Sequence, residues 1–178
     1  MDAHGIAGEI LHLGVPTLTV ETAAQAIGVQ PEQIVKSILF MVGAGLGPAL
    51  TAEPSAGEGL KPSHGEPVLA PAFVLAITCG TAYVERRLIA AHYGVGRKRV
   101  KLASPEEVQS ISGYEVGAMP PFGHRQPLPT LLDRRVLELT EVYAGGGEEN
   151  AMLRLDPRDI ARITGAVVMD LSALPQQE

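Results

Sequence analysis

Apolar runs of strand length follow one another along this chain, several with no helical stretch between them, and this succession constrains the fold most. The clearest run extends from Lys36 to Val42, is apolar after its first two residues and predicts a buried strand. Parallel neighbours in a sheet need a long crossover connection, so strands in direct succession favour a mixed or antiparallel sheet. We therefore expect an α/β fold of mixed α+β type with short helices packed around one sheet. Further strands are predicted at 68–70, 73–78, 100–102, 130–132, 139–144, 152–155 and 167–171.

Helices are predicted from apolar spacing and from capping residues. The spacing of Ile6, Ile10 and Leu13 predicts a first helix over 2–13. The other helices are expected where a capping residue or proline opens a segment and a glycine closes it. They are a helix capped by Thr19 and ended by Gly28, a helical turn opened by Pro31, a helix marked by Val84, Leu88 and Ala91 that ends at Gly94, a helix with a Ser104/Glu107 capping box that ends at Gly113, and a helix that starts at Asp156-Pro157 and ends at Gly165.

The chain shows no linker that would divide its 178 residues, so we expect one domain over 1–178. Residues 43–67 are rich in Gly, Pro, Ser and Glu and predict a long exposed loop. This loop opens with Gly43-Ala-Gly45-Leu-Gly47, but Pro48 and the tail after it offer no helix to receive a pyrophosphate. A plain loop is the favoured interpretation, and a nucleotide-binding domain is the alternative.

The composition excludes several classes of function. Cys79 is the single cysteine, which rules out an internal disulfide and a cysteine-based zinc site, and the five histidines show no metal-ligand spacing. We expect neither a metal nor a cofactor. The first ten residues lack the features of a signal peptide and no apolar stretch could span a bilayer, so we expect a cytoplasmic protein without membrane contact.

The charge distribution limits how the chain could bind nucleic acid. A net charge of -6 argues against a wide grip on a duplex and permits a contact with a single-stranded end. Six of the fourteen Lys and Arg residues fall between Arg86 and Lys101, where acidic residues are absent. The basic cluster of this chain is Arg97, Lys98, Arg99 and Lys101. A solvated surface and a nucleic-acid contact are both open interpretations of it.

Two segments carry the candidate chemistry. Lys36, at the mouth of an apolar strand, could hold an ammonium over a pocket and bind a phosphate or a carbonyl oxygen, or could simply reach into water. The stretch from Ser112 to His124 contains three glycines and two prolines, which predict a stiff, sharply turned loop. Gly117 lets a ligand approach the backbone, and its N–H could donate to an oxyanion; His124 could exchange a proton near neutral pH. A plain connecting loop is the alternative.

These segments, in their order along the chain, resemble the YbaK and prolyl-tRNA-synthetase-associated editing domain family. The resemblance spans roughly residues 15 to 172, and the ordered set of its segments is quite specific. The matching segments are Thr22-Ala-Ala-Gln-Ala-Ile-Gly28, Pro31-Glu-Gln-Ile-Val-Lys36-Ser-Ile-Leu-Phe40, Lys101-Leu-Ala-Ser-Pro-Glu-Glu-Val, Ser112-Gly-Tyr-Glu-Val-Gly117-Ala-Met-Pro-Pro-Phe-Gly-His124, Leu132-Asp133, Tyr143-Ala-Gly145-Gly146 and Leu155-Asp-Pro-Arg-Asp-Ile.

The resemblance implies a curved mixed sheet and hydrolysis of transfer RNA charged with the wrong small amino acid. The family lysine that engages the 3′ end of the substrate corresponds to Lys36, and the family GxxxP loop to Gly117–Pro121. The histidine near that loop corresponds to His124. The implied substrate-binding residues are Ser37, Ala118, Met119, Pro120, Pro121, Asp133, Gly145 and Gly146. Two departures are the long 43–67 segment and Cys79-Gly80-Thr81 in place of a Gly-Asp turn, and Ser37 leaves the substrate amino acid open.

The implied activity is that of a free-standing deacylase acting on tRNAPro charged with Ala, Cys, Ser or Thr. Its mechanism would need no metal, because the bond is an activated ester. Lys36 would supply electrostatics and binding, the Gly117 N–H would stabilise the oxyanion, and His124 would orient the substrate or a water. The expected partners are the acceptor end of a misacylated tRNA and, as a second candidate, an aminoacyl-tRNA synthetase. A non-catalytic module that binds charged tRNA or a synthetase is the alternative.

Overall fold

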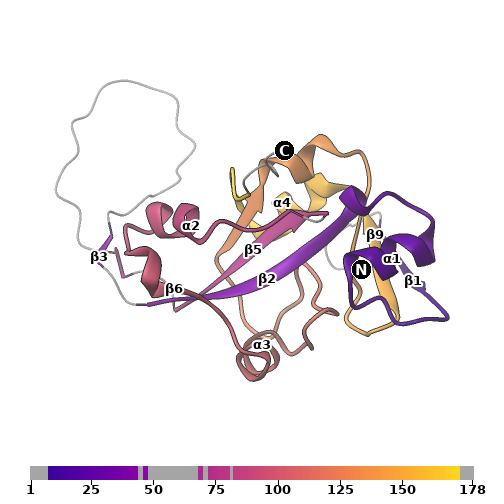
Figure 1. Ribbon diagram of the computed structural model, residues 1–178, viewed down its shortest axis with the longest axis horizontal. Helices are drawn as coiled ribbons and strands as arrows, with labels where there is room; N and C mark the ends of the chain where they lie inside the picture. The colour runs from indigo at the N-terminus through magenta and orange to yellow at the C-terminus, as the bar shows by residue number, and fades with distance from the viewer. Residues whose placement is uncertain (1–7, 44–45, 48–67, 70–71, 81, 173–178) are drawn as a thin grey trace, which may run out of the picture.

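A mixed eight-stranded sheet forms the centre of the protein in a computed structural model (Figure 1). The structure describes residues 8–43, 46–47, 68–69, 72–80 and 82–172. Along the sheet the order is β1-β9-β8-β2-β5-β7-β10, and β6 also pairs with β2. The strands are β1 (Glu9–His12), β2 (Ile34–Val42), β5 (Phe73–Cys79), β6 (Val100–Leu102), β7 (Thr130–Asp133), β8 (Val142–Gly145), β9 (Ala151–Leu155) and β10 (Val167–Met169). The expected mixed α/β fold is confirmed.

Strand β2 organises the sheet because three strands pair with it. Its pairing with β5 is antiparallel and runs from Val35 to Met41 along one edge. The other edge is shared: β8 pairs in parallel with Ile34 and Val35, and β6 pairs antiparallel with Phe40 to Val42. Residues 36–39 therefore lie in a gap between two ladders, along a stretch of this edge of β2 that no strand in the described part of the chain covers.

The two faces of the sheet are packed by different helices. One face carries Val35, Leu39 and Ile77, which belong to a core that also includes Val108 of α3 (Pro105–Ser112) and Ile160 of α4 (Pro157–Thr164). The opposite face carries a second core, in which Phe40, Val74 and Ala76 pack with Ile89 and Ala90 of α2 (Arg86–His92). In Figure 1, α2 and α3 accordingly lie on opposite sides of the β2–β5 pair. Strand alternation thus assigns every other residue of β2 to each face.

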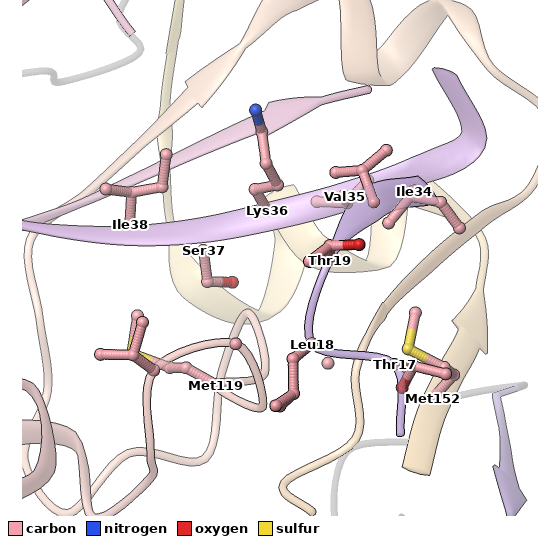
Figure 2. Close-up of a pocket in the computed structure, with 14 residues that line it drawn as sticks. Thr17, Leu18, Thr19, Ile34, Val35, Lys36, Ser37, Ile38, Met119 and Met152 are labelled. Atoms are coloured by element: carbon pink, nitrogen blue, oxygen red, sulfur yellow. The ribbon is translucent and has the colours of Figure 1, made fainter. Parts of the chain in front are cut away.

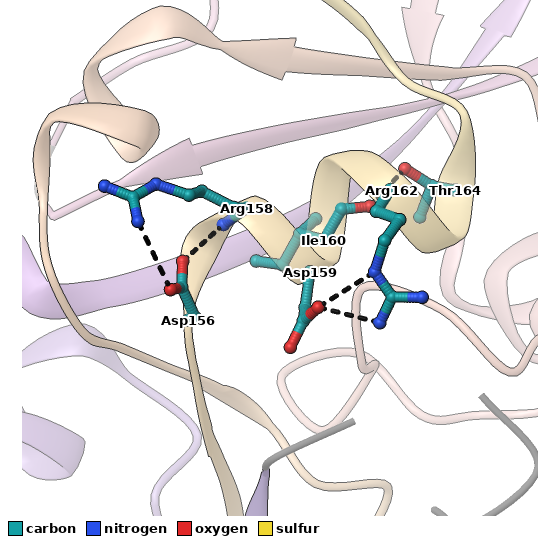
Figure 3. A network of polar contacts seen from close by, with 6 residues as sticks. All are labelled: Asp156, Arg158, Asp159, Ile160, Arg162 and Thr164. Carbon is teal, nitrogen blue, oxygen red and sulfur yellow. Dashed lines mark hydrogen bonds and ion pairs between the residues drawn. The ribbon is translucent and has the colours of Figure 1, made fainter. Parts of the chain in front are cut away.

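Three helices begin and end at the residues predicted from their caps. Helix α1 (Val20–Ile27) has a capping box between Thr19 and Thr22, and α3 has one between Ser104 and Glu107. Helix α4 begins after Asp156, whose side chain accepts from the Arg158 N–H, and ion pairs such as Asp159–Arg162 line its exposed side (Figure 3). These caps satisfy N–H groups that a helix end leaves without partners. The remaining short elements are the 3-10 helices η2 (Pro31–Gln33), η3 (Arg97–Arg99) and η4 (Arg134–Glu138).

Two sequence predictions are wrong in part. Residues Glu9–His12 form strand β1, antiparallel to β9, where we expected a helix; residues 2–7 of that helix lie outside the described part. The pairing of β1 with β9 supplies backbone hydrogen bonds and overrides a weak helical spacing. The strand predicted at 139–144 starts only at Val142, because η4 extends to Glu138 and the Leu139 N–H bonds to the Val136 carbonyl.

The predicted 43–67 loop lies mostly outside the described residues. Its described part includes strand β3 (Leu46–Gly47), which pairs with β4 (Val68–Leu69) in a separate two-stranded sheet. Residues 44–45 and 48–67 are not described, so the expectation of one long exposed loop stays a prediction. In the described ranges, no helix combines the length and the apolar character that crossing a bilayer requires.

Candidate functional site

A pocket of about 270 Å³ lies at the gap in the pairing of β2 (Figure 2). Its walls are residues 17–20 at the start of α1, residues 34–38 of β2, Val116, Gly117 and Met119 of the loop after α3, Gly145 of β8 and Met152 of β9. Pockets for drug-sized ligands measure about 300–1,000 Å³, so this one suits a smaller group. Lys36, Ser37, Gly117, Met119 and Gly145, all predicted from the sequence, come together here.

Lys36 and Ser37 contribute to the pocket from opposite faces of β2. The Lys36 ammonium donates to the Ala82 carbonyl at 2.7 Å and lies 5.8 Å from the centre of the Tyr83 ring. In Figure 2 it points away from Met119, whereas the Ser37 side chain points toward Met119. Burial lowers the pKa of Lys36 from its usual value. The residue therefore borders the pocket, but in this conformation its charge is held by a carbonyl outside it.

The Ser37 hydroxyl is buried and has no hydrogen-bond partner among the described residues. Its backbone is also directed into the gap. The Val42 N–H bonds to Ala72 on the β5 side, whereas the Leu39 carbonyl accepts from Ala103 on the other side. Residues of odd number in β2 therefore direct their N–H and C=O groups toward the edge that carries the gap. Ser37 thus presents both a hydroxyl and backbone polar groups where no strand pairs with them.

The loop that carries Gly117 packs closely against its neighbours. Gly117 has φ +92°, a conformation that glycine adopts readily, and a Cβ on it would lie 3.1 Å from the Leu18 carbonyl oxygen. The Ala118 carbonyl accepts a 2.9 Å hydrogen bond from the Gly147 N–H. No hydrogen bond found among the described residues uses the Gly117 N–H. The loop is thus fixed in place, and Gly117 lines the pocket with an N–H that has no partner among the described residues.

The structure places His124 away from this pocket. Its Nε2 lies 2.9 Å from the Pro120 carbonyl, which can only accept, so Nε2 carries the proton and donates. Burial lowers the pKa of His124, and this hydrogen bond opposes the shift. Together with Pro121, the ring lines a separate depression. Pro120, Pro121 and His124 therefore support the loop rather than face the space beside Ser37.

Asp133 and Gly146 also lie outside the pocket. Asp133 is 1 % exposed and accepts hydrogen bonds from the hydroxyls of Thr78 and Ser172 and from the Arg135 N–H. It joins β5, η4 and the segment after β10. Gly146 packs on the turn into β9, where a Cβ would lie 2.7 Å from the carbonyl carbon of Ala151. Ala118, whose carbonyl accepts from the Gly147 N–H, does not line the pocket either, so the structure does not bring these three expected substrate contacts to it.

The basic cluster is exposed at the opposite end of β2 from Lys36. Residues Arg97–Arg99 form η3, and Lys101 of β6 pairs with Met41. Met41 is five positions along β2 from Lys36, which corresponds to about 16 Å along an extended strand. A ligand that reached both the basic cluster and the pocket would meet them with different parts.

Sequence reasoning missed the wall formed by Thr17, Leu18, Thr19 and Met152. The sequence identified Thr19 as a helix cap. That Thr19 also lines the pocket depends on how α1 packs against β2, which the sequence does not give. Leu18 is 48 % exposed at the pocket wall, a position that only the structure reveals. The described part of the chain holds no cluster of three or more His, Cys, Asp or Glu suited to a metal ion.

Comparison with known families agrees with this architecture. The family model described as the aminoacyl-tRNA editing domain matches residues 60–163, which is more than half of the chain. The chain therefore belongs to the aminoacyl-tRNA editing domain family, as its motifs indicate.

Individual proteins that resemble this chain have less than 30% sequence identity to it in the following three comparisons. The uncharacterized protein YwhH of Bacillus subtilis (strain 168) is 23% identical over 156 residues, which cover 88% of this chain and 81% of YwhH. The crystal structure of the hypothetical protein APE2540 is 28% identical, with a TM-score of 0.75, and the match covers 97% of this chain and 95% of that one. A crystal structure described as "a putative trans-editing enzyme for prolyl tRNA synthetase" is 29% identical, with a TM-score of 0.74, and the match covers 97% and 91%.

Proposed function

We propose that this protein is a trans-acting deacylase that hydrolyses the ester of a misacylated tRNA, with tRNAPro charged with Ala, Cys, Ser or Thr as the substrate. The observation that carries this proposal is the small pocket where Lys36 and Ser37 of β2 meet Gly117 of the loop. Membership of the editing family and similarity to a structure described as a trans-editing enzyme support the same reaction class.

The pocket offers a hydrogen-bond donor for the negative charge that develops during ester hydrolysis. The Gly117 N–H would donate to the oxygen that becomes negative when water attacks the ester carbonyl. The proton of the water would pass to the ribose hydroxyl or the amine of the substrate, so the protein need not supply a general base. The leaving group is the ribose oxygen of the terminal nucleotide.

Lys36 has an electrostatic part in this mechanism. Its ammonium would exchange the Ala82 carbonyl for a phosphate of the 3′ end or for the ester oxygen. The flexible four-carbon stem allows this movement without a change in β2. Burial lowers the pKa of Lys36, but its Nζ serves as a hydrogen-bond donor to the Ala82 carbonyl, and so binding and polarisation are the roles that we assign to it.

The remaining residues act at a distance from the ester. His124, through the Pro120 carbonyl, would hold the loop that presents Gly117. The basic cluster would contact the acceptor stem, about 16 Å from Lys36 along β2. An aminoacyl-tRNA synthetase is the proposed protein partner, and the reaction places the protein in the cytoplasm.

Replacing Lys36 with Ala tests the proposal. We expect the rate of deacylation of the misacylated tRNA that the parent protein hydrolyses to fall about a hundredfold or more, which is typical when one transition-state contact is removed. Arg158→Ala, which removes an exposed cation on α4, is the matched control and should retain the parent rate. The assay is a panel of tRNAPro charged with Ala, Cys, Ser or Thr, with prolyl-tRNAPro as the cognate. A parent protein that binds these tRNAs and hydrolyses none would instead be a binding module.

A further inference from the structure

A second cavity of about 190 Å³ adjoins the pocket and shares Ser37, Gly117 and Met119 with it. Its other walls include the side chains of Leu39, Leu102, Ala103 and Val108. We name this cavity the apolar lobe. None of these four side chains offers a hydrogen-bond donor or acceptor. The Ser37 hydroxyl is therefore the polar side-chain group at the junction of pocket and lobe.

The other hydroxyls at the pocket are committed to the fold. The Thr17 hydroxyl donates to the Glu149 carbonyl at 3.1 Å, and the Thr19 hydroxyl caps α1 through the Thr22 N–H. Ser37 differs because its oxygen is buried without a partner among the described residues. Buried polar groups in native proteins nearly always have partners, and an unpaired one lowers stability. A ligand that reaches the junction would supply the missing hydrogen bond.

The surroundings of Ser37 select the kind of group that it can bind. A charged ammonium beside apolar side chains and one hydroxyl would lose more hydration free energy than the single hydrogen bond returns. A neutral hydroxyl on a short side chain needs only one such bond and can both donate and accept. The ester and the amine of a substrate would remain at the open edge of β2, near Gly117 and Lys36.

We propose that Ser37 makes this site selective for aminoacyl groups whose short side chain carries a hydroxyl, namely seryl and threonyl esters, over alanyl esters. The Ser37 hydroxyl bonds to the substrate hydroxyl, and the methyl group of a threonyl side chain enters the apolar lobe. This inference rests on the proposed deacylase function, because it assigns the aminoacyl group to the pocket.

The experiment compares kcat/KM on seryl-, threonyl- and alanyl-tRNAPro for the parent, Ser37→Ala and Ser110→Ala. Ser110 is an exposed serine on α3, so its replacement makes the same chemical change away from the pocket. We expect Ser37→Ala to lower the seryl-to-alanyl ratio of kcat/KM about tenfold, the usual effect of one hydrogen bond, and Ser110→Ala to leave the ratio unchanged. Thermal unfolding of each variant checks that the fold is kept.

The other outcomes separate the two hypotheses. An equal fall on all three substrates would mean that Ser37 contacts a part common to them, and it would overturn the selectivity while keeping the deacylase. If Ser37→Ala changed neither the seryl-to-alanyl ratio of kcat/KM nor the individual rates, the proposed selectivity would also be overturned. A parent protein that hydrolyses cysteinyl-tRNAPro but none of these three esters would overturn the selectivity and keep the deacylase, whereas a parent that hydrolyses none of the four esters would remove the proposed function as well.

Discussion

The carbonyl oxygen of Ala118 lies 2.6 Å from the point that a Cβ on Gly145 would occupy, so the loop that carries Gly117 rests directly on strand β8. The contact is backbone against backbone, and an added methyl group would have to displace the loop. A single hydrogen bond from the Gly147 N–H to the same carbonyl reinforces it. The position of the proposed oxyanion donor therefore depends on a glycine in a neighbouring strand.

Gly145→Ala is expected to destabilise the protein by about 1–3 kcal/mol, the usual cost of an overpacked interior, and to lower deacylation by more than the loss of folded protein explains. Urea unfolding and a deacylation assay well below the melting temperature measure the two effects. Gly96→Ala is the control, since its added Cβ would meet no atom within 4 Å and its φ is −68°. Equal behaviour of the two variants would contradict the proposed packing.

Asp133→Ala is expected to reduce stability by about 2–4 kcal/mol, because it leaves the buried hydroxyls of Thr78 and Ser172 without their acceptor. The folded fraction of Asp133→Ala should retain most of the deacylase activity of the parent, since Asp133 lies outside the pocket. Denaturant unfolding and initial rates test both statements. Asp170→Ala, at a carboxylate 79 % exposed and paired with Arg134, should unfold like the parent. Full stability with lost activity would instead place Asp133 in the substrate site.

Stability should fall on acidification partly because of His124. Its pKa is lower in the folded protein than the ordinary value of 6.5, so the unfolded chain binds the proton more readily. The neutral ring is fully compatible with folding above pH 6.5, and stability is lost as the pH drops below that value. Replacing His124 with Gln removes the titration.

The measurement is the melting temperature of parent and His124→Gln between pH 8 and pH 5. The melting temperature of the parent should fall more on acidification than that of His124→Gln. The difference in melting temperature between the two proteins should therefore become smaller. Burial also lowers the pKa of His92, which therefore contributes the same loss of stability on acidification to both proteins. The comparison of the two proteins cancels this contribution. Parallel curves would show that His124 does not titrate in this range.

The basic cluster should set the salt dependence of tRNA binding. Replacing Arg97, Lys98 and Arg99 together with Gln is expected to weaken binding and to reduce the slope of log K against log salt by about 2–3, because each phosphate contact contributes roughly 0.7–0.9. The control replaces Arg158 and Arg162 of α4, which pair with Asp156 and Asp159. An unchanged slope in the triple variant would identify the cluster as a solvated surface.

The sequence by itself determined the local elements and the family. Helix caps depend on residues that are close in the sequence. The capping box of Ser104 with Glu107 and the helix end at Gly113 are examples, because their hydrogen bonds form within about one helical turn. The apolar run of β2 is equally local. The ordered motifs around Lys36 and Gly117 were enough to indicate an editing domain, which the family match confirms.

Only the tertiary structure decided which groups meet. Residues 9–12 became a strand because β9 offered an unpaired edge, a fact absent from the local pattern. Pairing of β8 and β6 with the same edge of β2 opened the gap at Ser37, and on the other face of β2 the fold placed the Ala82 carbonyl within reach of the Lys36 ammonium. Such outcomes depend on contacts between residues far apart in the chain, whose free energies are set by three-dimensional packing.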